Sequence, residues 1–145
     1  IISEIGYTID NTTKTRALFE INKGVGKIDN VNVNTKLPEE LRRVQFKNMI
    51  YIADGPSDVP AFSTLNKSGG ATFANYPHND VKAFQQVEQL RKDGRVNMYA
   101  EADYSEGTTA YIWITEKIKE IANRIRNDEK AKLQASISAT PKHLT

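Results

Sequence analysis

Apolar and polar positions along the chain alternate between strand-like and helix-like periods. Short apolar runs rich in β-branched or aromatic residues predict four strands, at residues 4–9, 49–53, 71–76 and 96–100. Apolar residues at helical spacing predict four helices, at residues 14–23, about 59–65, 81–92 and about 106–126. Strands that alternate with helices favour an α/β fold, with a Rossmann-like, mostly parallel sheet and helices on both of its faces.

The same spacing predicts which side chains the helices bury. They are Leu18 and Ile21, Phe62 and Leu65, the stripe Val81, Phe84, Val87 and Leu90, and the stripe Tyr111, Ile114, Ile118, Ile121 and Ile125. We expect Asp103 or Ser105 to cap the last helix and the pattern to fade after Arg126, leaving residues 127–145 as an extended tail. Residues 25–47 are polar and predict a long surface connection with one short helical turn after Pro38.

The rest of the chain is organised around the strand at residues 49–53 and the turn that follows it. The strand stops at Asp54, Gly55 permits a tight turn, and Ser57 and Asp58 are good acceptors for the first N–H groups of a helix. Pro60 suits the first turn of that helix. Asp54 is therefore expected at the carboxyl edge of the sheet, where ligands of open α/β folds bind.

The loops after successive parallel strands lie along one edge of a sheet. Four side chains are expected along that edge, namely Asp54, His78, Asp80 and Asp103. The chain has no cysteine, and its two histidines, His78 and His143, are too far apart in sequence to indicate a zinc site. An acidic rim of this kind, with oxygen ligands, suits Mg²⁺.

Length and charge exclude several other classes of protein. With 145 residues the chain has the size of one domain, and a net charge of +2 gives no argument for a nucleic-acid partner. No apolar run reaches membrane-spanning length and no signal peptide opens the chain, so a cytoplasmic protein without a membrane partner is expected. The chain begins with Ile1 and Ile2 and passes directly into a predicted strand, which is the pattern of a fragment.

The run Ile52-Ala53-Asp54-Gly55-Pro56-Ser57-Asp58-Val59 resembles the fourth motif of the haloacid dehalogenase superfamily, in particular a bacterial branch of these hydrolases. Most members are magnesium-dependent phosphohydrolases with a Rossmann-like core. The resemblance implies that Asp54 is a magnesium ligand, that Asp58 binds or orients a metal-bound water and the loop, and that Ser57 contacts the substrate phosphate. The third motif of the family is a lysine that opens a helix. Lys14 matches it best, and Lys23, at the end of the same helix, is the second choice.

The first two motifs of the family have no counterpart in the chain. They are an Asp-x-Asp strand end, which supplies the nucleophile and the general acid/base, and a Ser or Thr after a strand, and both precede the lysine. The resemblance therefore implies that residues 1–145 are one partial core domain. It would be the metal-binding half of a phosphohydrolase that acts through an aspartyl-phosphate on a small phosphorylated substrate. Its partner would be the missing N-terminal half of the same polypeptide, and without that half the chain would be inactive.

Other readings of the same residues remain open. The chain is alternatively a non-catalytic scaffold or regulatory module with a hydrolase-like half-domain. A third reading, nucleic-acid binding through the C-terminal helix and tail, depends only on mild basicity. Residue by residue, Asp58 and Ser57 suit simple helix caps, Lys14 suits a solvated lysine, and His78 suits a surface loop. The sequence leaves open the identity of the substrate, the type of cap domain in the protein and the oligomeric state.

Overall fold

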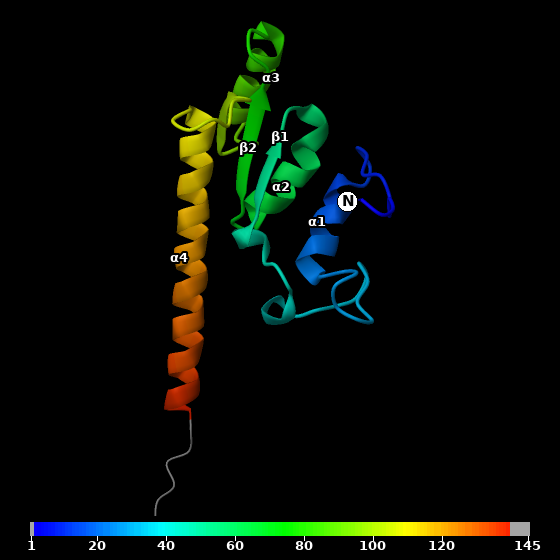
Figure 1. Ribbon diagram of the computed structural model, residues 1–145, viewed down its shortest axis with the longest axis vertical. Coiled ribbons are helices and arrows are strands. Elements are labelled where there is room, and N and C mark those ends of the chain that lie inside the picture. Colours follow the sequence, from blue (N-terminus) through cyan, green and yellow to red (C-terminus); the bar gives the residue numbers. More distant parts are fainter. Residues whose placement is uncertain (1, 140–145) are drawn as a thin grey trace, which may run out of the picture. The chain divides into compact units, whose positions relative to one another are not determined.

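The computed structural model describes residues 2–139 (Figure 1). The chain divides into two compact units, with the boundary between Asp103 and Tyr104. The first unit contains α1 (Lys14–Lys23), β1 (Ile50–Ala53), α2 (Val59–Lys67), β2 (Ala71–Tyr76), α3 (Val81–Lys92) and β3 (Met98–Glu101). Short 3₁₀ helices lie at Glu39–Leu41, Phe46–Asn48 and Pro56–Asp58. The second unit contains α4 (Thr109–Ser138).

The three strands of the first unit form a parallel sheet in the order β1-β2-β3. Tyr51 of β1 is level with Thr72 of β2, and Ala74 of β2 is level with Tyr99 of β3. The sheet has an α/β arrangement, because each strand is followed by a helix before the next parallel strand begins. The predicted α/β class and the predicted parallel sheet are therefore confirmed.

The core of the first unit lies between the sheet and helices α2 and α3. Phe62 of α2, Ala74 of β2 and Val87 of α3 are fully buried in one hydrophobic cluster. Both helices thus pack on one face of the sheet, as expected when strands follow one another in order and each connection has the same hand. The sequence also predicts helices on the other face of the sheet, and that part of the expected architecture stays a prediction.

Helix α1 adds a second cluster beside the first. Leu18 of α1 packs with Met49, at the start of β1, and with Ala61 and Leu65 of α2. Gly24 ends α1 in the left-handed conformation, with φ of 79°, and its N–H is bonded back to the last turn. The predicted boundaries of α1, residues 14–23, are confirmed.

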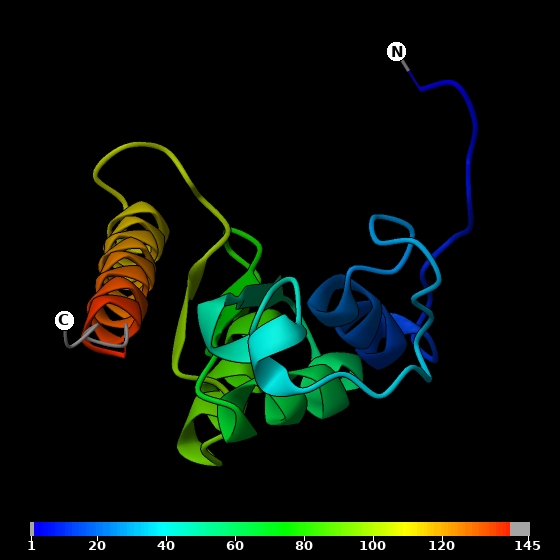
Figure 2. The same cartoon turned by 90° about the horizontal axis from the view of Figure 1, so that it is seen from below.

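The strand predicted at residues 4–9 is wrong. Residues 2–10 have no regular secondary structure and all of them are exposed. Figure 2 shows this N-terminal segment as an extended chain, and the hydroxyl of Tyr7 within it donates to a carboxylate oxygen of Glu20 in α1. The alternation of Ile5, Tyr7 and Ile9 suits a strand, but a strand needs a neighbour, and none of the described strands lies beside it.

Three expectations for burial also fail. Ile21 of α1 is predicted to be buried, yet it is 53% exposed. Val81 belongs to the predicted apolar stripe of α3, yet it is exposed, because it is the first residue of the helix and lies before the turn that packs on the sheet. Of the stripe predicted as core in α4, Tyr111, Ile118 and Ile125 are exposed. Helical spacing predicts that side chains share a face, but a covering partner is needed to bury that face.

The ends of α4 differ from the prediction as well. Thr108 caps its N-terminus and accepts a hydrogen bond from the N–H of Tyr111 at 3.3 Å, so neither Asp103 nor Ser105 is the cap. The helix continues to Ser138. The prediction of an extended tail is therefore wrong for residues 127–138. Residues 127–138 contain good helix formers and an i,i+3 pair between Lys132 and Glu129. The part of the predicted tail from residue 140 lies outside the described residues.

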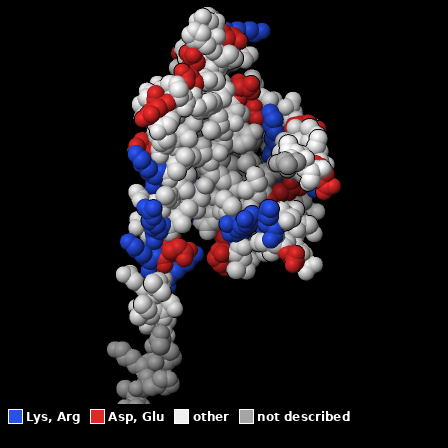
Figure 3. Space-filling view, in the orientation of Figure 1, with Lys and Arg blue, Asp and Glu red and all other residues white. Residues whose placement is uncertain are grey.

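Along α4, at the left of Figure 3, acidic and basic side chains lie close to one another. On α4 itself, Lys117 pairs with Glu120 and Lys119 pairs with Glu116. This is the charge pattern of a solvated helix face, as the sequence predicts, and it lends no support to a nucleic-acid interface. Among residues 2–139, no helix combines the length and the apolar character that crossing a membrane requires.

Candidate functional site

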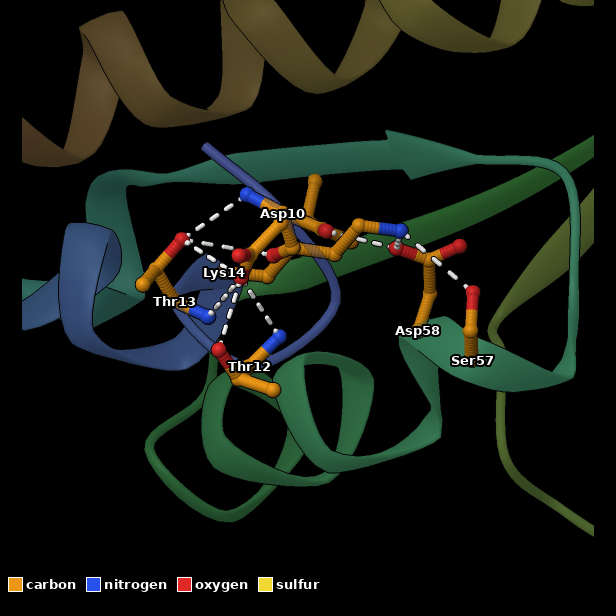
Figure 4. A network of polar contacts seen from close by, with 7 residues as sticks. Asp10, Thr12, Thr13, Lys14, Ser57 and Asp58 are labelled. Carbon is orange, nitrogen blue, oxygen red and sulfur yellow. Dashed lines mark hydrogen bonds and ion pairs between the residues drawn. The ribbon is translucent and has the colours of Figure 1, made fainter. Parts of the chain in front are cut away.

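Lys14 and Asp58 come together although they lie far apart in the sequence. The Nζ of Lys14, in the first turn of α1, is 2.8 Å from Oδ1 of Asp58, at the start of α2. The same ammonium donates to Oγ of Ser57 at 3.4 Å (Figure 4). Three of the four predicted site residues therefore form one polar cluster near the carboxyl end of β1, which we call the Lys14–Asp58 cluster.

The carboxylate of Asp58 has a different role from a helix cap. Asp58 occupies the N-cap position of α2, but its side chain makes no capping hydrogen bond. It is 1% exposed, and Oδ1 is the atom that contacts Lys14. Oδ2 is also buried and has no hydrogen-bond partner among the described residues. A buried carboxylate oxygen without a partner is costly, and capping does not explain the burial of Asp58. Oδ2 is therefore available to one more donor.

Tyr51 completes the cluster and was missed by the sequence reasoning. Its hydroxyl donates to Oδ1 of Asp58 at 2.8 Å, so that this oxygen accepts from both a phenol and an ammonium. Burial raises the pKa of Tyr51, and the hydrogen bond to Asp58 and the charge of that carboxylate raise it further. A tyrosine on the packed face of a strand needs a hydrogen-bond partner for its hydroxyl. This requirement is the sequence signal from which Tyr51 could have been predicted as part of the site.

Asp10 is a second residue that the sequence reasoning did not single out as part of the site. Its Oδ1 accepts from the backbone N–H groups of Thr12 at 2.9 Å and Thr13 at 3.1 Å, and from both threonine hydroxyls (Figure 4). The hydroxyl and N–H of Thr12, ahead of those of Thr13, lower the pKa of Asp10. This turn fixes the start of α1 and hence the position of Lys14.

A lysine in the first turn of a helix is slightly disfavoured by the helix dipole. Here the carboxylate of Asp58 compensates, since it lies against the ammonium. Lys23, the second choice for the motif lysine, lies at the other end of α1, where its Nζ donates to the carbonyl of Val33 at 2.6 Å. The geometry therefore brings Lys14, and not Lys23, to Asp58.

Asp54 makes no hydrogen bond or ion pair with this cluster. It follows directly after Ala53, the last residue of β1, and it is exposed. Its side chain has no hydrogen bond or ion pair within the described chain. Gly55 is extended, with φ of −158° and ψ of 178°, so the turn after Asp54 does not use the special conformations of glycine that the sequence reasoning expected. The carboxylate at the end of β1 is thus presented to solvent, as a metal ligand at this edge has to be.

The other members of the predicted acidic rim are engaged elsewhere or contribute nothing to a metal cluster. Asp80 caps α3 and accepts from the N–H of Ala83 at 2.8 Å. His78 is exposed, and its Nδ1 is 2.8 Å from a carboxylate oxygen of Glu101. Among residues 2–139, no group of three or more His, Cys, Asp or Glu side chains is placed to hold a metal ion.

The residues that are present suit one side of a magnesium site. Asp54 offers an exposed carboxylate, and Oδ2 of Asp58 offers a buried acceptor that lacks a partner. Because Oδ1 of Asp58 already contacts an ammonium, this carboxylate is better suited to accept from a metal-bound water than to bind the ion directly. The remaining ligands of Mg²⁺ would have to come from water and from outside the described residues.

Comparison with known proteins identifies a longer relative of this chain. The chain is 45% identical over 121 residues to an uncharacterized protein of Borreliella burgdorferi. The match covers 81% of this chain and 40% of that protein, so the chain spans less than half the length of the relative. No family model matches the chain, and no solved structure matches it significantly.

Proposed function

We propose that this chain is the metal-binding half of a magnesium-dependent phosphohydrolase of the haloacid dehalogenase type. The contact between Lys14 and Asp58 is the observation that supports the proposal most strongly. The resemblance to the family rests on two separate segments, and the fold brings the lysine of one to the second aspartate of the other. A buried carboxylate paired with a helix-starting lysine is what phosphoryl transfer needs near a crowded set of negative charges.

Each of the four residues has a distinct role in this proposal. Asp54 would hold Mg²⁺, and Oδ2 of Asp58 would accept a hydrogen bond from a water molecule beside the ion, while Oδ1 of Asp58 contacts Lys14. The ammonium of Lys14 stabilises the transferring phosphoryl group, and Ser57 donates its hydroxyl to a phosphate oxygen. When bound, Mg²⁺ supplies charge neutralisation and polarises the phosphoryl oxygens. Tyr51 and Asp10 position Asp58 and Lys14 and do not contact the substrate.

The nucleophile of this reaction is proposed to lie in the rest of the polypeptide. An aspartate there would attack the phosphorus of a small phosphate monoester, forming a P–O bond to the enzyme while the bond to the alcohol breaks. A second acid would give the alcohol its proton, and water would then release phosphate. The relative from Borreliella burgdorferi extends well beyond the matched region, and this leaves room for such a segment. We also propose that the protein works in the cytoplasm.

The second candidate function is a non-catalytic module that keeps the hydrolase-like half as a scaffold. One observation favours it: the described residues contain no cluster of three side chains that could hold a metal. The two candidates differ in what lies outside this chain. A natural polypeptide with an Asp-x-Asp strand end supports the enzyme, and one without it supports the scaffold.

The proposed function is tested with the longer natural polypeptide and a generic aryl phosphate. We expect hydrolysis that requires Mg²⁺ and falls by at least about 100-fold in Asp54→Asn. The matched control is Asp29→Asn, which removes the same charge from an exposed loop residue of the 25–47 connection. Turnover in Asp54→Asn that equals that of the control would refute the assignment.

A further inference from the structure

One edge of β1 is unpaired. The carbonyl of Met49 accepts from the N–H of Ala71, so the backbone groups of residue 49 face β2. Backbone direction alternates along a strand, and therefore the groups of Tyr51 and Ala53 also face β2, while those of Ile50 and Ile52 face the opposite edge. No strand within residues 2–139 pairs with that edge, because β1 is the terminal strand of the sheet.

An apolar groove runs along this same edge. It has a volume of about 490 Å³ and lies between one face of α1 and the start of β1. Its walls include Ala17, Leu18 and Ile21 from α1, and Met49 and Ile50 from the strand side. A bare strand edge beside an apolar groove is a place where another strand adds well, since backbone hydrogen bonds and side-chain burial are gained together.

The N-terminal segment also reaches the groove. Ile9, the last apolar residue of the N-terminal segment, lines it together with residues of β1. Ile5, Tyr7 and Ile9 alternate in the manner of a strand, yet all three are exposed. The segment thus has the sequence pattern of a strand, lies beside the groove through Ile9, and pairs with none of the described strands.

We propose that the groove along β1 receives a β-strand from the part of the same polypeptide that lies outside residues 1–145. The proposal shares with the proposed function only the view that the natural polypeptide is longer. The relative from Borreliella burgdorferi gives this view its support, since the matched region is 40% of that protein. The added strand pairs with Ile50 and Ile52 and covers the exposed side chain of Ile21, which makes β1 an interior strand of a larger sheet.

The groove leads to the Lys14–Asp58 cluster. Lys14 is one of its lining residues, and the ammonium of Lys14 contacts Asp58. A parallel strand, which continues the direction of β1, β2 and β3, therefore ends beside these two residues. Occupation of the groove also reduces the exposure of Lys14, whose side chain is 25% exposed in this chain.

Amide hydrogen exchange tests the proposal residue by residue. In the 145-residue chain, we expect β2 to protect the amides of Tyr51 and Ala53, and we expect those of Ile50 and Ile52 to exchange quickly. In the longer natural polypeptide we expect the amides of Ile50 and Ile52 to slow by at least about 100-fold, with Tyr51 and Ala53 as internal references. Fast exchange at Ile50 and Ile52 in the longer polypeptide overturns the proposal, and so does a natural polypeptide that is no longer than this chain.

A pair of variants gives a second, independent readout. Ile21 and Ile112 are equally exposed, at 53%, and both lie on helices, but only Ile21 lines the groove. We expect Ile21→Lys to restore fast exchange at Ile50 and Ile52 in the longer polypeptide and Ile112→Lys to leave their protection unchanged. Equal effects of the two variants contradict the proposal. Protection that depends on protein concentration also contradicts it, because it shows two copies pairing through their β1 edges.

The exchange readout separates this proposal from the proposed function. Protected amides in a polypeptide that does not hydrolyse phosphate esters leave the strand-receiving groove standing and refute the enzyme. Hydrolysis of phosphate esters by a polypeptide in which the Ile50 and Ile52 amides exchange quickly supports the enzyme and refutes the strand-receiving groove.

Discussion

The Nζ of Lys14 lies 2.8 Å from Oδ1 of Asp58, and this contact ties the start of α1 to the start of α2. The Asp58 side chain is almost fully buried, and the Lys14 side chain is 25% exposed. Tyr51 donates to the same carboxylate oxygen from β1. One carboxylate thus joins three elements of the first unit, and the stability of the unit depends on its partners.

Removing the ammonium should destabilise the chain. Lys14→Met leaves a buried charge without its cation, and we expect a loss of about 2–3 kcal/mol in the free energy of unfolding, because Lys14 is not fully buried. The control is Arg16→Met, which breaks an exposed pair with Glu20 and should cost less than about 0.5 kcal/mol. Urea denaturation measures both. Equal losses in the two variants would show that the Lys14–Asp58 contact is unimportant for stability.

Tyr51→Phe should cost about 1.5 kcal/mol, because it removes a hydrogen bond to a charged acceptor in a buried place. The matched control is Tyr99→Phe, in which the altered ring packs against the same core cluster from β3. Urea denaturation of the two variants provides the comparison. A loss in Tyr51→Phe no greater than that in Tyr99→Phe contradicts the role given to the Tyr51 hydroxyl.

The raised pKa of Tyr51 predicts a specific dependence of stability on alkaline pH. Above about pH 10 the unfolded chain loses the phenolic proton while the native chain keeps it. The native state then binds more protons than the unfolded state, so stability falls as pH rises, and the contribution is fully present below that pH. We expect the fall to be shallower in Tyr51→Phe, measured by denaturation at several pH values. Parallel curves for the two proteins would contradict the prediction.

Substitution by alanine should reduce stability at Gly70 and leave it nearly unchanged at Gly55. A Cβ on Gly70 would lie 2.6 Å from the carbonyl oxygen of Phe46 and 2.8 Å from Cγ of Leu65, so Gly70→Ala should cost about 1–3 kcal/mol. A Cβ on Gly55 meets no heavy atom within 4 Å, and the backbone there is extended. Gly55→Ala should therefore change stability by less than about 0.5 kcal/mol. Thermal unfolding distinguishes the two variants, and equal shifts would mean that the close approach at Gly70 is absent.

Most helices and strands of the first unit are predictable from the sequence because local signals agree with the fold. Helix α3 has Asp80 as its cap and apolar residues at helical spacing, and its observed bounds, Val81–Lys92, are those predicted. Residues 4–9 show the limit of such signals. Their alternation is as regular as that of a strand, but strand formation depends on a neighbour that local pattern does not supply.

The site is predictable only in part, for a similar reason. The resemblance to the hydrolase family selects Lys14, Asp54, Ser57 and Asp58, and the fold brings three of these into one cluster. Local pattern alone gives Asp58 a second explanation as a helix cap, and only the tertiary contact with Lys14 removes it. Tyr51 was missed because a tyrosine in a strand looks like an ordinary core residue until its partner is known.

The most direct test of the central claim, that Asp54 presents a carboxylate for a hard cation at the end of β1, is a metal titration of the longer natural polypeptide. Mn²⁺, a paramagnetic substitute for Mg²⁺, reports binding through water proton relaxation, and Mg²⁺ should displace it. We predict one site per chain whose affinity falls by at least about 10-fold in Asp54→Asn and is unchanged in Asp29→Asn. Equal affinity in these two variants would contradict the account.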